Sequence, residues 1–574
     1  MRRTHTKTIL IAALGLTMTM PTDAQEQEQA RAPERDRTQA RSVVVTRFGI
    51  VAAEQPLAAQ AGVQILSAGG NAIDAAVATN AAMGLMSPTG NGIGGDLFAL
   101  VYIAKEKKVY GLNASGWAPA GHTLEYYKSK GLEKLPERGV YAVTVPGTVA
   151  GWDALVGKFG TKKFSELLAP AIRYAEEGFP VAELVAGGWR ASTRMLSATP
   201  SAGKTFLING QPPRAGEIFR NPDLAGSLKR IAAANGREGY YTGEIAKRIV
   251  EAVNALGGKW TEADLAEFRA EWVEPISTTY RGWRVYEIPP QGQGIAALMM
   301  LNLMEHFPIG EWGHNTAKTM HVEIEAKKLA YADMLRYVGD PRFAKMPVAG
   351  MLSKDYAKER VKLIDTAKAN CNVEAGKPPA PGDDTIYLSV VDMEGNIVSL
   401  IQSNYSGFGS GIVPEGVGFM LHNRGALFSM DPQSPNVIAG RKRPLHTIIP
   451  AFMEKDDVKI GFGIMGGWNQ SQAHAQFVSN VVDHGMNIQA AMEAARFTKQ
   501  TFPGCDVDME RRVPEAVRNE LTAMGHQIRL LATYSGTVGG GQATMRNFST
   551  GVSSGASDPR KDGFAAPQPA PAKP

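Results

Sequence analysis

The segment DTIYLSVVDMEGNIVSLIQSNYSGFGSGIVP, from Asp384 to Pro414, carries the clearest structural pattern in the chain. Apolar residues alternate along Ile386 to Val391, with the two-residue period of a β-strand. Glu394-Gly395 then supplies a turn, and Ile397 to Ser403 returns as a second strand. The segment therefore predicts a β-hairpin.

The register of this hairpin brings two hydroxyl side chains together. If Met393 pairs with Asn396 across a two-residue turn, Thr385 falls opposite Ser403 or Asn404, allowing one residue of register error. We therefore expect a threonine and a second hydroxyl to meet at the start of the first strand.

A threonine at this place has a catalytic interpretation. A threonine hydroxyl is almost fully protonated at neutral pH, so it needs a base within hydrogen-bonding distance to act as a nucleophile. Cutting the peptide bond before Thr385 would free an α-amine, a group whose usual pKa of about 7.7 to 8.0 lets it accept the hydroxyl proton. The alternative is that Thr385 only begins a β-strand, and the hairpin alone does not decide between the two.

The residues before the hairpin suit a cleavage site. Asn370 to Asp384 is rich in Asn, Gly, Pro, Ala and Asp and has almost no apolar residue, as expected of an exposed connection. Farther upstream the chain is helix-rich, with apolar residues three and four positions apart. The predicted helices are Pro56 to Ser67, Ile73 to Met86, Glu244 to Leu256, Ala296 to Met304 and His321 to Tyr337.

The N-terminus has the three parts of an export signal. Positive charges lie between Met1 and Lys7, an apolar stretch runs from Thr8 to Met20, and Thr22-Asp23-Ala24 forms a small-residue cleavage pattern. We therefore expect residues 1–24 to be a signal peptide and the mature protein to be soluble, and periplasmic or secreted. The alternative, a membrane anchor, needs about 20 apolar residues, and this run is shorter.

Both ends of the mature chain are expected to be disordered. Residues 25–41 are polar and charged, with no periodic apolar pattern, and residues 562–574 are rich in Pro and Ala. Cleavage before Thr385 would divide the chain into a large subunit, residues 42–384, and a small subunit, residues 385–574.

Composition argues against several classes of function. The 574 residues are 44% hydrophobic and 20% charged, and the formal charge of +5 is not gathered into a basic stripe, so nucleic acid binding is not expected. Cys371 and Cys505 are the only cysteines, which leaves room for one disulfide with the pairing open. His422, His446 and His474 have no metal-binding spacing, and we expect neither a metal nor an organic cofactor.

The hairpin segment resembles the nucleophile segment of the gamma-glutamyltranspeptidase family, and the resemblance extends over most of the chain. The matching motifs are GGNAIDAAVA (Gly69 to Ala78), GNGIGGD (Gly90 to Asp96), VPGTVAGW (Val145 to Trp152), EAKKLAYAD (Glu325 to Asp333), KRP (Lys442 to Pro444), MGG (Met465 to Gly467) and GASDPRKDG (Gly555 to Gly563). The resemblance implies an α+β fold, the four-layer αββα sandwich of the N-terminal-nucleophile hydrolases. It also implies self-cleavage before Thr385 into large and small subunits that associate as a heterodimer.

By this resemblance Thr385 is the nucleophile. Ser403 replaces the family's second threonine, whose hydroxyl contacts the nucleophile. Gly466 and Gly467 match the glycine pair whose backbone N–H groups stabilise the tetrahedral oxyanion. The catalytic residues implied by the resemblance are therefore all present.

The residues that hold a γ-glutamyl group in the family are changed here. Ser115 stands where the family has an arginine for the α-carboxylate, and Leu427 stands at the acidic position for the α-amine. The other candidate substrate contacts are Tyr405 at an asparagine position, Arg424 at a glutamine position, and His446 and Thr447 at a pair of serines. Arg424 is either a new ligand for an acyl carboxylate or a solvated surface arginine.

These changes make the chain similar to the branch of the family that contains cephalosporin and glutaryl acylases. The segment from Asp431 to Arg441 is also shorter than the family's lid-bearing loop, which would open the site to water and to bulkier acyl groups. The leading prediction is a self-processing γ-glutamyl amide hydrolase or transferase of the glutathione hydrolase type, in which Thr385 forms an acyl-enzyme and water is the main acceptor. The alternatives are a glutaryl or cephalosporin-type acylase acting on desamino acyl amides, and an inactive binding protein of the same fold.

Overall fold

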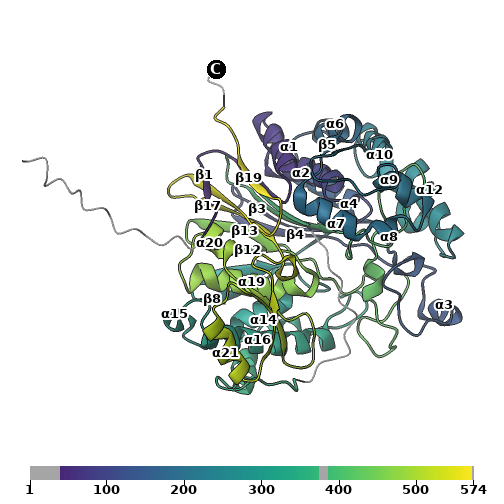
Figure 1. Ribbon diagram of the computed structural model, residues 1–574. Coiled ribbons are helices and arrows are strands. Elements are labelled where there is room, and N and C mark those ends of the chain that lie inside the picture. The colour runs from purple at the N-terminus through teal and green to yellow at the C-terminus, as the bar shows by residue number, and fades with distance from the viewer. Residues whose placement is uncertain (1–38, 374–385, 572–574) are drawn as a thin grey trace, which may run out of the picture.

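Two seven-stranded antiparallel β-sheets stack at the centre of the computed structural model, which describes residues 39–373 and 386–571 (Figure 1). In spatial order the first sheet consists of β19 (Phe564–Pro567), β2 (Ile50–Ala53), β10 (Ile386–Val391), β11 (Ile397–Ser403), β3 (Asp96–Ile103), β4 (Lys108–Ala114) and β7 (Glu271–Val273). The second consists of β1 (Val44–Thr46), β18 (Val552–Ser557), β17 (Gly541–Asn547), β13 (Val458–Ile464), β12 (Ala451–Lys455), β9 (Trp283–Glu287) and β8 (Ile276–Tyr280). A small three-stranded sheet consists of β14 (Phe497–Thr498), β15 (Asp506–Glu510) and β16 (Gln527–Leu531). A two-stranded sheet consists of β5 (Phe179–Pro180) and β6 (Ile218–Phe219).

Side chains that alternate along the strands of the two large sheets fill three cores. In β3, Leu97 and Val101 pack with the helices outside the first sheet. Phe98 and Leu100 point the other way and pack with Phe452 of β12, between the two sheets. A third core lies between the second sheet and its own helices. The layers therefore run helix, sheet, sheet, helix, and the predicted αββα sandwich is confirmed.

Helices cover the outer face of each sheet (Figure 1). On the side of the first sheet lie α1 (Pro56–Ser67), α2 (Ala72–Met86), α4 (Thr148–Phe159), α5 (Phe164–Leu167), α6 (Ala169–Glu177), α7 (Glu183–Ala191), α8 (Thr193–Leu196), α9 (Pro200–Phe206), α10 (Pro222–Ala233), α11 (Glu238–Tyr241), α12 (Gly243–Ala255) and α13 (Glu262–Ala266), with α3 (Leu124–Ser129) farther out. On the side of the second lie α14 (Gly294–Met304), α15 (Ile309–Trp312), α16 (Ala317–Tyr337), α17 (Val348–Met351), α18 (Lys354–Arg360), α19 (Gln470–Val482), α20 (Ile488–Glu493) and α21 (Glu515–Ala523).

The five helices predicted from periodicity are α1, α2, α12, α14 and α16, and each is confirmed within a few residues at its ends. The N-terminus of α2 shows why the sequence fixes such a boundary. The Asn71 side chain accepts the N–H groups of Ile73 and Asp74, and the Asp74 carboxylate accepts the N–H of Asn71. This capping box satisfies N–H groups that the first helical turn leaves without partners.

The predicted hairpin is present as β10 and β11. Ile386 faces Gln402 at one end of the ladder. The connecting loop has three residues, 393–395, rather than the two expected. The observed register thus differs by one residue from a two-residue turn, within the error allowed, while Thr385 itself lies outside the described residues.

The chain ends are more ordered than expected where they are described. Phe564–Pro567 forms β19 beside β2, so the expectation of disorder from residue 562 onward is wrong for these residues. Ala565 and Ala566 bury small side chains there, which a composition rich in Pro and Ala does not preclude. At the other end, Ala40 and Arg41 donate backbone N–H groups to the Glu493 carboxylate, so disorder is also wrong at these two positions. Residues 1–38 lie outside the described part of the chain.

Segments from both sides of the expected cleavage point build the first sheet. β2, β3, β4 and β7 precede residue 384, while β10, β11 and β19 follow it. Cys371 and Cys505 form a disulfide, which resolves the pairing that the sequence left open. Within residues 39–373 and 386–571, we find no helix that combines the length and the apolar character needed to cross a bilayer.

Candidate active site

A buried carboxylate, Asp96, lies at the centre of the candidate site. It begins β3 beside the end of β11, where its partner across the ladder is Ser403. Asp96 Oδ2 accepts a hydrogen bond from His446 Nε2 at 2.7 Å and from Arg424 Nε at 3.3 Å. His422 Nδ1 lies 3.5 Å from the same oxygen. The pairing of β3 with β11 therefore gathers an acid, an arginine and two histidines next to Ser403.

Asp96 and Arg424 carry the charge of this cluster. Burial opposes ionisation of Asp96, but the contacts with His446 and Arg424 hold the pKa of its carboxyl below the usual range. Burial lowers the pKa of His446 to about 4 and also lowers the pKa of His422. The Ile448 N–H donates to His446 Nδ1 at 3.3 Å, which leaves the proton of the neutral ring on Nε2, facing Asp96. At neutral pH the cluster thus holds one ion pair and two neutral histidines.

Arg424 is fully buried, so the alternative of a solvated surface arginine is wrong. Its Nη1 donates to Thr447 Oγ1 at 2.6 Å. The guanidinium carbon lies 4.6 Å from the centre of the Tyr405 ring, a cation–π distance. Among the residues that the structure describes, Arg424 Nη2 has no hydrogen-bond partner. The guanidinium is thus held on three sides, with one donor group left over.

Tyr405 turns the chain immediately after β11. Its φ of +77° lies in the left-handed region, which residues other than glycine rarely adopt. The Tyr405 N–H donates to Ser403 Oγ at 2.8 Å, and its ring packs against Arg424. These contacts hold a backbone conformation of the kind that concentrates at functional sites.

Gly466 and Gly467 form the turn between β13 and α19. Their φ angles are +114° and +57°, a conformation that favours glycine. The chain continues through a 3₁₀ turn, Gly467–Asn469, into α19, so the glycine N–H groups lie at the positive end of a helix. The Gly466 carbonyl accepts the Asn469 N–H at 2.9 Å, and the Gly467 carbonyl accepts Gln293 Nε2 at 2.7 Å. The orientation of this turn is therefore fixed, as an oxyanion site requires.

Gln293 at the start of α14 joins the two parts of the site, a role that the sequence does not predict. Its Nε2 donates both to the Thr447 carbonyl at 2.5 Å and to the Gly467 carbonyl at 2.7 Å. Its Oε1 accepts the Tyr331 hydroxyl at 3.0 Å. No local motif marks this glutamine, whereas Asp96 lies in the GNGIGGD motif and could have been singled out as a buried acid.

His474 binds the end of β13, two residues before the glycine turn. Its Nε2 accepts the N–H of Ile464, the last residue of β13, at 3.1 Å, so its proton lies on Nδ1 and faces Glu287 Oε1 at 2.8 Å. Burial lowers the pKa of His474 to about 3. This histidine therefore has a structural role.

Ser115 lies in a polar network next to the cluster. Its Oγ donates to Asn113 Oδ1 at 2.8 Å and accepts from Gln291 Nε2. The Gln291 carbonyl in turn accepts the His446 N–H at 3.0 Å. The described candidate residues therefore belong to one connected network, while Thr385 lies outside the described residues.

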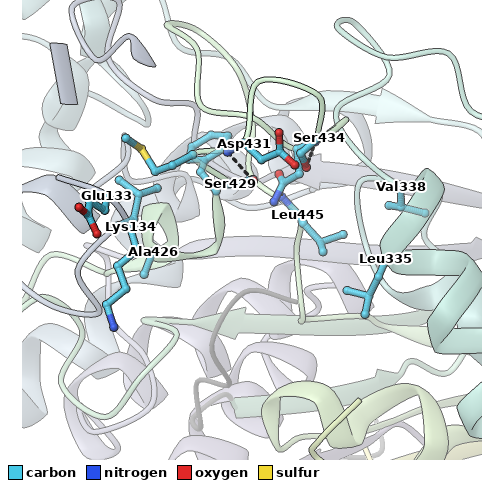
Figure 2. Close-up of a pocket in the computed structure, with 13 residues that line it drawn as sticks. Glu133, Lys134, Leu335, Val338, Ala426, Ser429, Asp431, Ser434 and Leu445 are labelled. Atoms are coloured by element: carbon cyan, nitrogen blue, oxygen red, sulfur yellow. Dashed lines mark hydrogen bonds between the residues drawn. The ribbon is translucent and has the colours of Figure 1, made fainter. Parts of the chain in front are cut away.

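A cavity of about 620 Å³ is lined in part by residues close in sequence to this network (Figure 2). Ala426, from the 3₁₀ turn Arg424–Leu427, and Leu445, which precedes His446, both line it. Figure 2 shows Leu335 and Val338 on one side and Glu133 and Lys134 on the other. The short segment expected to replace a lid contributes Asp431, Ser434 and Asn436 to the wall. Two residues of the cavity wall are thus close in sequence to Arg424 and His446, while neither of these two side chains lines the cavity.

Three comparisons agree with this architecture. A family model described as gamma-glutamyltranspeptidase matches residues 58–568. The chain is 35% identical over 530 residues to the glutathione hydrolase-like YwrD proenzyme of Bacillus subtilis (strain 168), covering 92% of this chain and 99% of that protein. It is 35% identical over 532 residues to the oxamate amidohydrolase proenzyme of Klebsiella pneumoniae, covering 91% of this chain and 99% of that protein.

Among solved structures, the cephalosporin acylase from Bacillus halodurans matches with a TM-score of 0.86 and 44% identity, covering 93% of this chain and 98% of that one. The names of these relatives include hydrolases and acylases and differ in substrate. The family model and the relatives nevertheless span nearly the whole αββα sandwich and its buried network, and on that basis the chain belongs to the gamma-glutamyltranspeptidase family of N-terminal-nucleophile amidohydrolases.

Proposed function

We propose that this protein is a self-processing hydrolase of γ-glutamyl or related acyl amides, with Thr385 as its nucleophile and water as its main acceptor. The observation that carries the proposal is the register of the first sheet. Ile386, which follows Thr385, pairs with Gln402, and the next residue of β11, Ser403, pairs with Asp96. The residue that follows the predicted nucleophile in sequence therefore pairs next to Ser403, which supports a role for Thr385 near the buried network.

The proposed reaction has two stages. The free α-amine of Thr385 accepts the proton of its hydroxyl, the oxygen attacks the amide carbon, and the C–N bond breaks as the proton passes to the leaving amine. An ester between the acyl group and Thr385 remains. Water then attacks the ester carbon and gives up a proton to the amine, and the carboxylic acid leaves as Thr385 regains its hydroxyl proton. In both stages the N–H groups of Gly466 and Gly467 would stabilise the tetrahedral oxyanion.

The second candidate function is a glutaryl or cephalosporin-type acylase, and the surroundings of the acyl site favour it. Leu427 is buried and apolar at the position where the resemblance expects an acid for the substrate α-amine. The Ser115 hydroxyl is engaged by Asn113 and Gln291. Relatives named cephalosporin acylase and oxamate amidohydrolase support activity on acyl groups without a γ-glutamyl amine.

A direct comparison of two anilides tests these functions. Glutaryl anilide differs from γ-glutamyl anilide only by the missing α-amine. If an unrecognised acid binds that amine, kcat/KM should be about 10- to 100-fold higher for the γ-glutamyl substrate, the worth of a hydrogen bond to a charged group. Equal or better turnover of glutaryl anilide would support the acylase. Absence of glutaryl turnover would rule the acylase out, and cleaved protein that hydrolyses neither anilide would contradict the proposed function.

We also propose that the protein works in the periplasm or outside the cell as a heterodimer. The signal-like residues 1–24 support export. The disulfide between Cys371 and Cys505 supports an oxidising compartment, because such bonds are rare in the cytosol. The word proenzyme in the names of the relatives supports cleavage into two subunits.

A further inference from the structure

We propose that Arg424, held in place by Asp96, binds the free carboxylate of the substrate acyl group. This inference rests on the proposed amide hydrolysis and specifies which end of the acyl chain the site recognises. Both γ-glutamyl and glutaryl groups carry this carboxylate, at the same distance from the amide.

The contacts of Arg424 leave one donor group for a ligand. A guanidinium has five N–H donors in a fixed planar arrangement. Nε donates to Asp96 and Nη1 donates to Thr447, while Nη2 has no partner in the described part of the chain although the side chain is fully buried. A buried donor without a partner is destabilising, and a carboxylate is the acceptor that guanidinium geometry suits best.

The contacts of Arg424 link it to both described parts of the candidate site. On one side its guanidinium packs on Tyr405, whose N–H binds Ser403 Oγ. On the other side it binds Thr447, whose carbonyl shares Gln293 with the Gly467 turn. A short acyl chain attacked at its amide carbon between these two sides would extend its free end toward Arg424.

Asp96 acts in this arrangement as a positioning residue. It compensates the charge of Arg424 while the site is empty, and its contact with Nε orients the guanidinium plane. Arg424 and His446 both bind Asp96 Oδ2, whereas Asp96 Oδ1 has no hydrogen-bond partner among the described residues. Arg424 Nη2 supplies the donor for a carboxylate, and Leu427, at the position where the resemblance expects an acid, is apolar. The ligand class is therefore an acyl amide whose far end is a carboxylate.

The test compares glutaryl anilide with butyryl anilide, which has the same acyl chain without the carboxylate. The quantity measured is the ratio of their kcat/KM values in processed enzyme. The wild type should favour the glutaryl substrate, and Arg424→Gln should lower the ratio by about 10- to 100-fold, the range for one hydrogen bond to a charged group. Asp96→Asn should lower the ratio mainly by raising KM for the glutaryl substrate. Arg360→Gln, which breaks the ion pair with Asp333 outside the site, should leave the ratio unchanged.

A purely structural role for the pair gives a different result. In that case Arg424→Gln would lower kcat/KM equally for both substrates, and the proposal would be wrong. If the single variant does not fold, the double variant Asp96→Asn with Arg424→Gln removes both buried charges together, and its ratio should be near one. A folded double variant that keeps the wild-type ratio overturns the carboxylate site while leaving amide hydrolysis intact. A wild-type enzyme that cleaves no anilide would instead remove the proposed function, and this inference with it.

A second and independent inference concerns the disulfide. We infer that the two products of cleavage stay covalently joined, because Cys371 precedes Thr385 and Cys505 follows it. The surrounding contacts also cross between the two parts. The Gly504 N–H donates to the Cys371 carbonyl at 3.2 Å, and the Ala369 N–H donates to the Met524 carbonyl at 2.7 Å. The C-terminal region of the large subunit is therefore bonded to the small subunit.

Gel electrophoresis of thiol-blocked protein separates this inference from the cleavage on which it rests. Purified protein should run as two bands after reduction and as one band, with the summed mass, without reduction. The Cys371→Ser variant should give two bands in both cases. Two bands from unreduced wild type would overturn the covalent link while leaving cleavage intact. One band in the reduced sample would show that cleavage itself has not occurred, and the inference would fail with it.

Discussion

Thr385→Ala protein should remain a single uncut chain, with the summed mass of the two fragments of the wild type, and should hydrolyse no amide. The expected cleavage between Asp384 and Thr385 is intramolecular, because the threonine hydroxyl is attached beside the carbonyl that it attacks. Such proximity replaces a bimolecular encounter and accounts for a large rate advantage. Alanine removes the attacking oxygen, so both maturation and turnover should be lost. Reducing gels and an anilide assay measure the two losses.

Thr385→Ser is the matched control, because serine keeps the hydroxyl and removes only the methyl group. This variant should cut slowly and retain part of the activity. Purified Thr385→Ala protein that still splits at the same bond, in the absence of a contaminating protease, would contradict the assignment of the nucleophile.

Much of the architecture could be predicted because it is encoded by local patterns. The two-residue period of β10 and β11 and the helical spacing of α1 and α2 each follow from residues close in sequence. The hairpin register was predicted to within one residue, because the loop has three residues rather than two. The glycine pair could be named only through the family motif, since its positive φ angles have no sequence signal beyond glycine itself.

The part of the site that the sequence did not predict depends on contacts between distant segments. Asp96 and Arg424 are 328 residues apart, and only the pairing of β3 with β11 and the path of the chain after it bring them together. Arginine side chains are mostly exposed, and Arg424 belongs to no helix or strand that the sequence predicts. The sequence therefore left two alternatives open for Arg424, a surface position and a buried contact with the substrate. In the same way β19 was missed because its pairing with β2 comes from sheet topology, not from its own short sequence.

The second large effect is expected at the glycine turn. Gly466 has φ +114°, and a Cβ added there would lie 3.1 Å from the Asn469 Cβ, so Gly466→Ala should rotate the turn. Loss of one oxyanion donor typically lowers kcat by about 100- to 1000-fold. We expect a decrease of that size in kcat, with a smaller change in KM and slower self-cleavage. Steady-state kinetics with an anilide and a time course on reducing gels measure these effects.

Gly485→Ala is the matched control for the backbone cost of this substitution. Gly485 also has a positive φ, +63°, but it lies in the loop after α19, and no neighbouring atom lies within 4 Å of an added Cβ. It should lower the midpoint of thermal unfolding by an amount typical of alanine at positive φ, and kcat should not change. If Gly466→Ala lost stability to the same extent as Gly485→Ala and kept wild-type kcat, the turn would be structural, and the oxyanion donors would have to be sought elsewhere in the network around Asp96.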